Sequence, residues 1–127
     1  MAGGGGTVLL VEDEDGVRAV AAERLRELGY EVLEAGDGPA ALRLLRPGRR
    51  VDLLVTDVGL PGGMNGRQVA DAARERRPGL PVLFITGYAG TALDGRLAPG
   101  MEVINKPFPL DTLAVQAQAL LEAALVR

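Results

Sequence analysis

Short runs of apolar and β-branched residues recur along the chain, and they constrain its fold more than any other feature. The run Thr7-Val8-Leu9-Leu10-Val11 is typical of a strand. Strands are predicted at residues 7–11, 31–34, 51–56, 81–86 and 101–104. Strands that are apolar throughout, rather than alternating, are covered on both faces, which is the pattern of a parallel sheet.

Helical patterns separate these strands. Apolar residues at helical spacing lie at Val17, Val20, Ala21, Leu25 and Leu28, and again at Leu113, Ala117, Leu120, Leu121 and Leu125. Asp37 is expected to cap a helix that runs through Leu45, and Asn65-Gly66 opens another. Between Gly87 and Gly100 only a short or mobile helix is expected, because glycine and proline recur there. Alternating strands and helices predict an α/β sandwich with right-handed crossovers.

Composition excludes several classes of protein. The chain has 127 residues, 47% of them hydrophobic and 24% charged, so one folded domain is expected over residues 7–126, after a glycine-rich leader at 1–6. The absence of Cys and His removes disulfides, thiolate metal sites and any role as a phosphohistidine donor. A net charge of −3 favours neither nucleic acid nor membrane as a partner. The expected compartment is the cytoplasm.

Ionic and hydroxyl side chains lie at or just after the carboxyl ends of four of the five predicted strands. They are Glu12-Asp13, Asp57, Thr86 and Lys106. Lys106 is the only lysine among 14 basic residues, and it offers a point charge on a flexible stem where the chain otherwise uses the arginine fork. Since parallel sheets bind ligands at the carboxyl ends of their strands, these residues are expected to form one site.

Three carboxylates brought together repel one another, and a hard divalent cation such as Mg²⁺ or Mn²⁺ removes the conflict. One Asp would then be free to form an aspartyl-phosphate, with Lys106 and the Thr86 hydroxyl on its phosphoryl oxygens. Each residue also has a simpler interpretation. Asp13 would cap a helix, Asp57 would begin a turn, Thr86 would bond to backbone, and Lys106-Pro107 would be a plain turn.

Over about residues 6 to 126 the chain closely resembles the response-regulator receiver family of two-component signalling. The matching motifs are Val8-Leu9-Leu10-Val11-Glu12-Asp13-Glu14, Leu60-Pro61-Gly62-Gly63-Met64-Asn65-Gly66 after Asp57, Ile85-Thr86-Gly87-Tyr88, and Asn105-Lys106-Pro107-Phe108. The resemblance implies a flavodoxin-like, doubly wound, five-stranded parallel sheet of order 2-1-3-4-5, an order that a chemotaxis regulator exemplifies.

The resemblance also implies a role for each motif residue. Asp57 would be the phospho-acceptor. The metal would be held by Asp13, by Glu12 mostly through water, by Asp57, and by the backbone carbonyl of Gly59. Thr86 and Lys106 would bind the phosphoryl group, small Gly87 would leave the acceptor open, and Lys106-Pro107 would be a cis peptide.

Two departures from the family pattern affect the switch. The Pro61-to-Met64 loop is one glycine longer than usual, so a looser lip is expected. Val103 stands where many members place a switching Tyr or Phe, and Tyr88 is a secondary candidate for that role.

The predicted function is that of a phospho-acceptor in a phosphorelay, which assists only its own phosphotransfer and dephosphorylation. The expected donor is a histidine kinase or a histidine phosphotransfer domain, and the downstream protein is unknown. The loop motifs look most like receivers of hybrid sensor histidine kinases. A stand-alone regulator is the alternative, and a weak homodimer is left open.

Three rival classes of protein fit the sequence less well. An aspartate-nucleophile phosphatase of the haloacid-dehalogenase type looks for a second Asp where Gly59 stands. A flavin- or nucleotide-binding module would want glycine or hydroxyl residues in place of Glu12-Asp13-Glu14-Asp15. A receiver-like module that is never phosphorylated has no need of the complete acid, Thr and Lys set.

Overall fold

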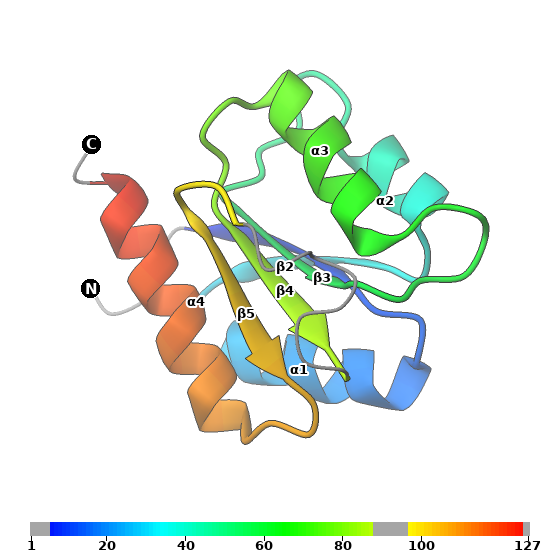
Figure 1. Cartoon of the computed structure of the whole chain (residues 1–127). Helices are drawn as coiled ribbons and strands as arrows, with labels where there is room; N and C mark the ends of the chain where they lie inside the picture. The colour runs from blue at the N-terminus through cyan, green and yellow to red at the C-terminus, as the bar shows by residue number, and fades with distance from the viewer. Residues whose placement is uncertain (1–5, 88–96, 126–127) are drawn as a thin grey trace.

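The computed structural model describes residues 6–87 and 97–125. Its centre is a parallel sheet in the order β2-β1-β3-β4-β5 (Figure 1). The strands are β1 (Thr7–Val11), β2 (Glu31–Ala35), β3 (Leu53–Asp57), β4 (Val82–Thr86) and β5 (Met101–Asn105). Every residue of β1, β3 and β4 is buried, as the continuous apolar runs predict.

Helices cover both faces of the sheet. They are α1 (Asp15–Glu27), α2 (Gly38–Leu44), α3 (Gly66–Arg76) and α4 (Leu110–Leu125). Helices α1 and α4 lie on one face and α2 and α3 on the other (Figure 1). The helix expected between residues 87 and 100 falls largely on residues 88–96, outside the described ranges. The observed architecture is the predicted doubly wound α/β sandwich.

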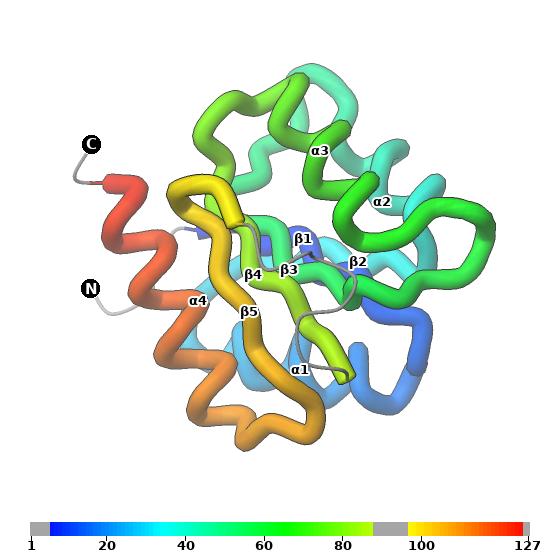
Figure 2. The backbone as a smooth tube through the Cα atoms, in the orientation of Figure 1, coloured from blue at the N-terminus to red at the C-terminus, as the bar shows by residue number. Residues whose placement is uncertain are grey.

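Side chains of β1 divide the core between the two faces. Val8 and Leu10 pack with α1 and α4, whereas Leu9 and Val11 pack with α2 and α3. All four are fully buried. Because β1 lies between β2 and β3, its carboxyl end is placed beside the end of β3 (Figure 2).

Local capping explains where α2 and α3 begin. The Asp37 carboxylate accepts a hydrogen bond from the Ala40 backbone at 2.8 Å, as expected of a cap. Asn65 and Gln68 form a capping box at the start of α3. Helix α1 starts after Glu14 with no side-chain capping bond. Asp13 therefore does not cap α1, and the simpler interpretation of that carboxylate is wrong.

Two residues expected on inward helix faces point to solvent instead. Val20 is 48% exposed and Leu125 is 85% exposed. The buried stripe of α1 consists of Ala21, Ala22 and Leu25, so Val20 lies one position off it. Leu125 is the last residue of α4. Within the described ranges, no helix combines the length and apolar character needed to cross a bilayer.

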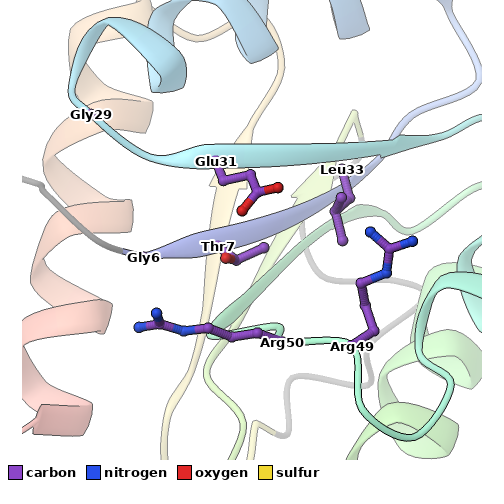
Figure 3. Close-up of a pocket in the computed structure, with 7 residues that line it drawn as sticks. All are labelled: Gly6, Thr7, Gly29, Glu31, Leu33, Arg49 and Arg50. Carbon is purple, nitrogen blue, oxygen red and sulfur yellow. The ribbon is translucent and has the colours of Figure 1, made fainter.

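A polar pocket of about 330 Å³ lies at the opposite edge of the sheet from the strand ends. Thr7 and Glu31 line it from the starts of β1 and β2, and Arg49 and Arg50 line it from the segment before β3 (Figure 3). Arg50 pairs with Asp52 at 2.8 Å. In a parallel sheet, the starts of the strands are separated from their carboxyl ends by the strand length, so this pocket is remote from Asp57.

Candidate functional site

Asp57 ends β3 and is 7% exposed. Its Oδ2 lies 2.9 Å from Lys106 Nζ, and its Oδ1 accepts a hydrogen bond from the Gly59 backbone at 3.3 Å. The bond to Gly59 is the local contact that a turn-forming Asp makes. The bond to Lys106 is different, because it joins the ends of β3 and β5 across the sheet.

Glu12 follows β1 and is 1% exposed. Its Oε2 accepts from the Glu14 backbone at 3.1 Å, and its backbone N–H donates to Ala35 O at 3.0 Å. Burial raises the pKa of Glu12 to about 7, against the lowering effect of the Glu14 backbone bond and of Lys106. A carboxyl held this deep in the fold gains strongly from any cation that approaches it.

Glu12, Asp13 and Asp57 form one acidic cluster. Each contributes a carboxylate oxygen, and these oxygens all lie within 4.8 Å of one another. Glu12 and Asp57 are buried while Asp13 is exposed, so the cluster opens to solvent on the Asp13 side. The sequence predicted this set from the ends of two strands that the topology makes neighbours.

Lys106 is the cation that faces the cluster. Its Nζ lies 2.9 Å from Asp57, 3.1 Å from Glu12 and 3.1 Å from Glu14. Burial by itself lowers the pKa of Lys106, but its close contacts with the three carboxylates outweigh it and raise the pKa above its ordinary value. Lys106 therefore stays charged at every physiological pH. The Lys106-Pro107 bond that follows is cis, as the resemblance implies.

The donor set suits a hard divalent cation. Glu12 Oε1 is buried and, although it lies near Lys106 Nζ, it has no hydrogen bond to any described residue. Three carboxylates with one counter-ion leave excess negative charge in a partly buried place. Oxygen ligands in this number, beside open solvent that supplies water, are what Mg²⁺ prefers. The residues present therefore fit such an ion.

Thr86 and Gly87 lie beside the acceptor Asp57, on the side of β3 that faces β4. Thr86 ends β4, is 7% exposed, and follows Ile85, which is the register partner of Asp57. The Lys106 backbone donates to the Thr86 carbonyl at 2.8 Å, so the two predicted phosphoryl-binding residues are adjacent. Gly87 is exposed, and a Cβ built there would meet nothing within 4 Å.

Val103, one of the two candidate secondary switch residues, lies in β5. Val103 is half-buried and packs against the α2–α3 core, and its carbonyl accepts from Gln116 Nε2 at 3.5 Å. Tyr88 lies outside the described residues.

The glycine-rich loop after β3 is held at its far end. Gly62 and Gly63 have φ of +85° and +83°, a conformation that side chains disfavour. Met64 then packs on Gly38, where a Cβ would come within 2.9 Å of it. The extra glycine is accommodated by positive φ, and the loop closes against the start of α2.

Sequence reasoning assigned no role to two residues that contact this site. Glu14 pairs with Lys106, although the sequence shows it only as part of an acidic motif. Arg18 donates to the Glu12 carbonyl at 2.7 Å. An arginine in the first turn of the helix that follows the acidic loop is the available signal, because helical side chains lean back toward the helix N-terminus.

Comparison with known proteins agrees with this geometry. The family model described as response regulator receiver domain matches residues 8–118. The chain therefore belongs to the response-regulator receiver family. Receiver domains are signalling modules, and the resemblance inferred from the four motifs is confirmed.

The chain is similar in sequence to two kinds of protein, a sensor kinase and a response regulator. It is 38% identical over 122 residues to the sensor kinase CckA of Brucella abortus, covering 94% of this chain but 13% of the kinase. It is 34% identical over 119 residues to the response regulator receiver protein CpdR of the same organism, covering 92% of this chain and 98% of that protein. The chain thus spans a small part of one relative and nearly all of another.

Solved structures share the fold. The crystal structure of the receiver domain from the hybrid histidine kinase CckA is 42% identical with a TM-score of 0.78, and the match covers 91% of this chain and 99% of that one. TrrA from Thermotoga maritima, solved in complex with Mg²⁺-BeF, is 28% identical with a TM-score of 0.79 over 91% of this chain and 99% of that one.

Proposed function

We propose that this chain accepts a phosphoryl group on Asp57 from the phosphohistidine of a histidine kinase or histidine phosphotransfer domain. The observation that carries the proposal is the convergence of Glu12, Asp13 and Asp57 within 4.8 Å, with Lys106 bonded to Asp57. Family membership supports the reaction class. The structure solved with Mg²⁺-BeF supports the choice of ion.

Asp13, Asp57 and Glu12 would hold Mg²⁺, together with the Gly59 carbonyl, and Mn²⁺ would serve in its place. When bound, the ion would neutralise charge on the transferred phosphoryl group. An Asp57 carboxylate oxygen attacks phosphorus, an O–P bond forms, and the P–N bond to the donor histidine breaks. The imidazole nitrogen keeps that bond's electrons and ends protonated.

Lys106 and Thr86 stabilise the product. Lys106 Nζ, now on Asp57, Glu12 and Glu14, would turn one of its bonds to a phosphoryl oxygen. The Thr86 hydroxyl would bond a second oxygen and draw the following segment inward, biasing a pre-existing equilibrium of surface arrangements. The group adds up to about two negative charges at neutral pH.

An apolar groove beside the site supports a protein donor. It measures about 560 Å³ and is lined by Val17, Val20 and Ala21 of α1 and by Lys106, Pro107 and Phe108. Because Lys106 lines both the groove and the acidic cluster, a donor seated on α1 would bring its histidine to Asp57. This contact gives a reason for the exposure of Val20.

The proposal is tested by phosphorylation with a small-molecule phosphodonor and Mg²⁺. Mass spectrometry should show the mass of one phosphoryl group on the wild-type chain and none on Asp57→Asn. Asp71→Asn, an exposed carboxylate of α3, is the matched control and should be labelled normally. Label retained on Asp57→Asn would refute the assignment of the acceptor.

We propose further that the chain is part of a hybrid sensor histidine kinase. CckA supports this in both comparisons. A free single-domain regulator is the second candidate, supported by the 98% coverage of CpdR. The coding sequence upstream of residue 1 decides between them, since a kinase core in the same reading frame is required by the first and absent from the second.

A further inference from the structure

We infer that Arg18 is a positioning residue for the metal site, an inference that rests on the proposed function. The Arg18 side chain leaves α1 and reaches back to the loop that carries two of the proposed ligands. Its Nη1 donates to the Glu12 carbonyl at 2.7 Å, and its Nη2 lies 2.9 Å from the Asp15 carboxylate. It contacts the backbone between the ligands without touching the carboxylates that would hold the ion.

The bonded carbonyl belongs to the peptide that joins Glu12 to Asp13. Because a peptide unit is planar, fixing its C=O direction fixes the plane from which the Asp13 Cα departs. Glu12 is held independently by β2, through its N–H on Ala35 O, and by burial. Within the described ranges no residue bonds to the exposed Asp13 side chain, so the direction of its carboxylate depends on that peptide plane.

Arg18 is itself anchored to the edge of the sheet. Its Nε lies 3.3 Å from Glu34 Oε1 on β2, and Arg26 holds the other oxygen, Oε2, at 3.0 Å. The planar guanidinium thus contacts three partners, one on the loop, one in the first turn of α1 and one on strand β2. A lysine ammonium at the same position would not reach all three in fixed geometry.

Charge and geometry predict opposite effects of removing Arg18. A positive side chain near a cation site weakens cation binding, so loss of charge alone would tighten Mg²⁺ binding. Loss of positioning would weaken it, and outer-shell partners of metal ligands typically contribute 10- to 100-fold in affinity. The sign of the change therefore separates the two explanations.

The experiment is a calorimetric Mg²⁺ titration of the full chain and three variants. Arg18→Ala and Arg18→Lys should each raise the Kd about tenfold, the lower end of the range for such partners. Arg26→Ala is the matched control, because it removes the same charge from α1 and the same kind of bond to Glu34 but leaves the Glu12 carbonyl bonded. Its Kd should stay within twofold of wild type.

A second measurement separates a positioning role of Arg18 from a general loosening of the fold. With the small-molecule phosphodonor, the Arg18 variants should need about tenfold more Mg²⁺ for half-maximal rate, while the rate at saturating Mg²⁺ falls less than threefold. Arg18→Lys keeps the charge and most of the side-chain length, so it provides the same readout if Arg18→Ala does not fold. An Arg18 variant that binds Mg²⁺ as tightly as Arg26→Ala, or more tightly, overturns the inference.

The same binding experiment would give a different result if the proposed function itself were wrong. In that case the wild-type chain itself would show no Mg²⁺ binding, or Asp13→Asn would bind as well as wild type. If wild type binds, Asp13→Asn does not, and the Arg18 variants are unchanged, the metal site stands and only the role of Arg18 is wrong.

Discussion

At the scale of single residues, Gly66 has little freedom to change. It opens α3, and its backbone N–H donates to the Val58 carbonyl at 2.8 Å. A Cβ built on Gly66 would lie 2.0 Å from the Asp57 carbonyl oxygen. The helix start and the strand end that carries the acceptor are therefore packed backbone to backbone, and only glycine permits that distance.

Gly66→Ala should destabilise the fold by roughly 1–3 kcal/mol or more, because the clash is with backbone that cannot rotate away. It should also weaken Mg²⁺ binding, since relief of the clash must move Asp57 or α3. Urea unfolding measures the first effect and calorimetry the second. Gly16→Ala is the control, because a Cβ there meets nothing within 4 Å and alanine favours a helix. Equal stability of the two variants would contradict the packing argument.

At the scale of elements, two arginines of the α3 end hold the end of α2. Arg77 donates to the carbonyls of Leu45 at 2.9 Å and Arg46 at 3.3 Å, and also to that of Arg49. Arg76 donates to Leu42 O at 3.2 Å. Since α2 runs only from Gly38 to Leu44, its unsatisfied carbonyls are a large share of its backbone, and side chains of another helix supply their donors.

Arg77→Ala should lower the free energy of unfolding by about 1.5–3 kcal/mol, the range for hydrogen bonds to a charged group. Arg77→Lys should recover less than half, because a point charge cannot bond three carbonyls at once. Amide exchange should rise in residues 45–52 more than in β1. Arg43→Ala, an exposed residue in the last turn of α2, should change stability by less than about 0.5 kcal/mol. An equal loss in both variants would argue against specific capping.

The elements also show which features of the fold can be predicted from the sequence alone. Continuous apolar runs located β1, β3 and β4, and Asp37 and Asn65 marked two helix starts, because strand burial and capping are local properties. The strand order came from family resemblance. The contacts of Arg77 with the α2 end and of Glu14 with Lys106 join residues 28 to 92 positions apart, and no local pattern encodes such pairs. The exposure of Val20 was missed because neighbouring helix positions share its apolar spacing.

At the scale of the whole molecule, the acidic cluster couples ion binding to folding. An unfolded chain does not hold Glu12, Asp13 and Asp57 together, so Mg²⁺ binds the folded state and stabilises it. At 100 times the Kd, the expected gain is about 2.7 kcal/mol. Lys106 supplies counter-charge to Asp57 and Glu12. Lysine and metal therefore compete for some of the same oxygens.

Lys106→Met should consequently be less stable than wild type without Mg²⁺ but gain more from its addition. Buried Glu12 and Asp57 lose their cation, while removal of one unit charge near the ion is worth at least about 1 kcal/mol, or about fivefold in Kd. Urea unfolding across a Mg²⁺ series measures both effects in one experiment. Arg50→Met is the charge-matched control, because Arg50 lies at the opposite edge of the sheet, and its Mg²⁺ increment should equal that of wild type (Figure 3). If Lys106→Met binds Mg²⁺ more weakly than wild type, Lys106 orients the carboxylates instead of competing for them, and the electrostatic account of the site would have to be reversed.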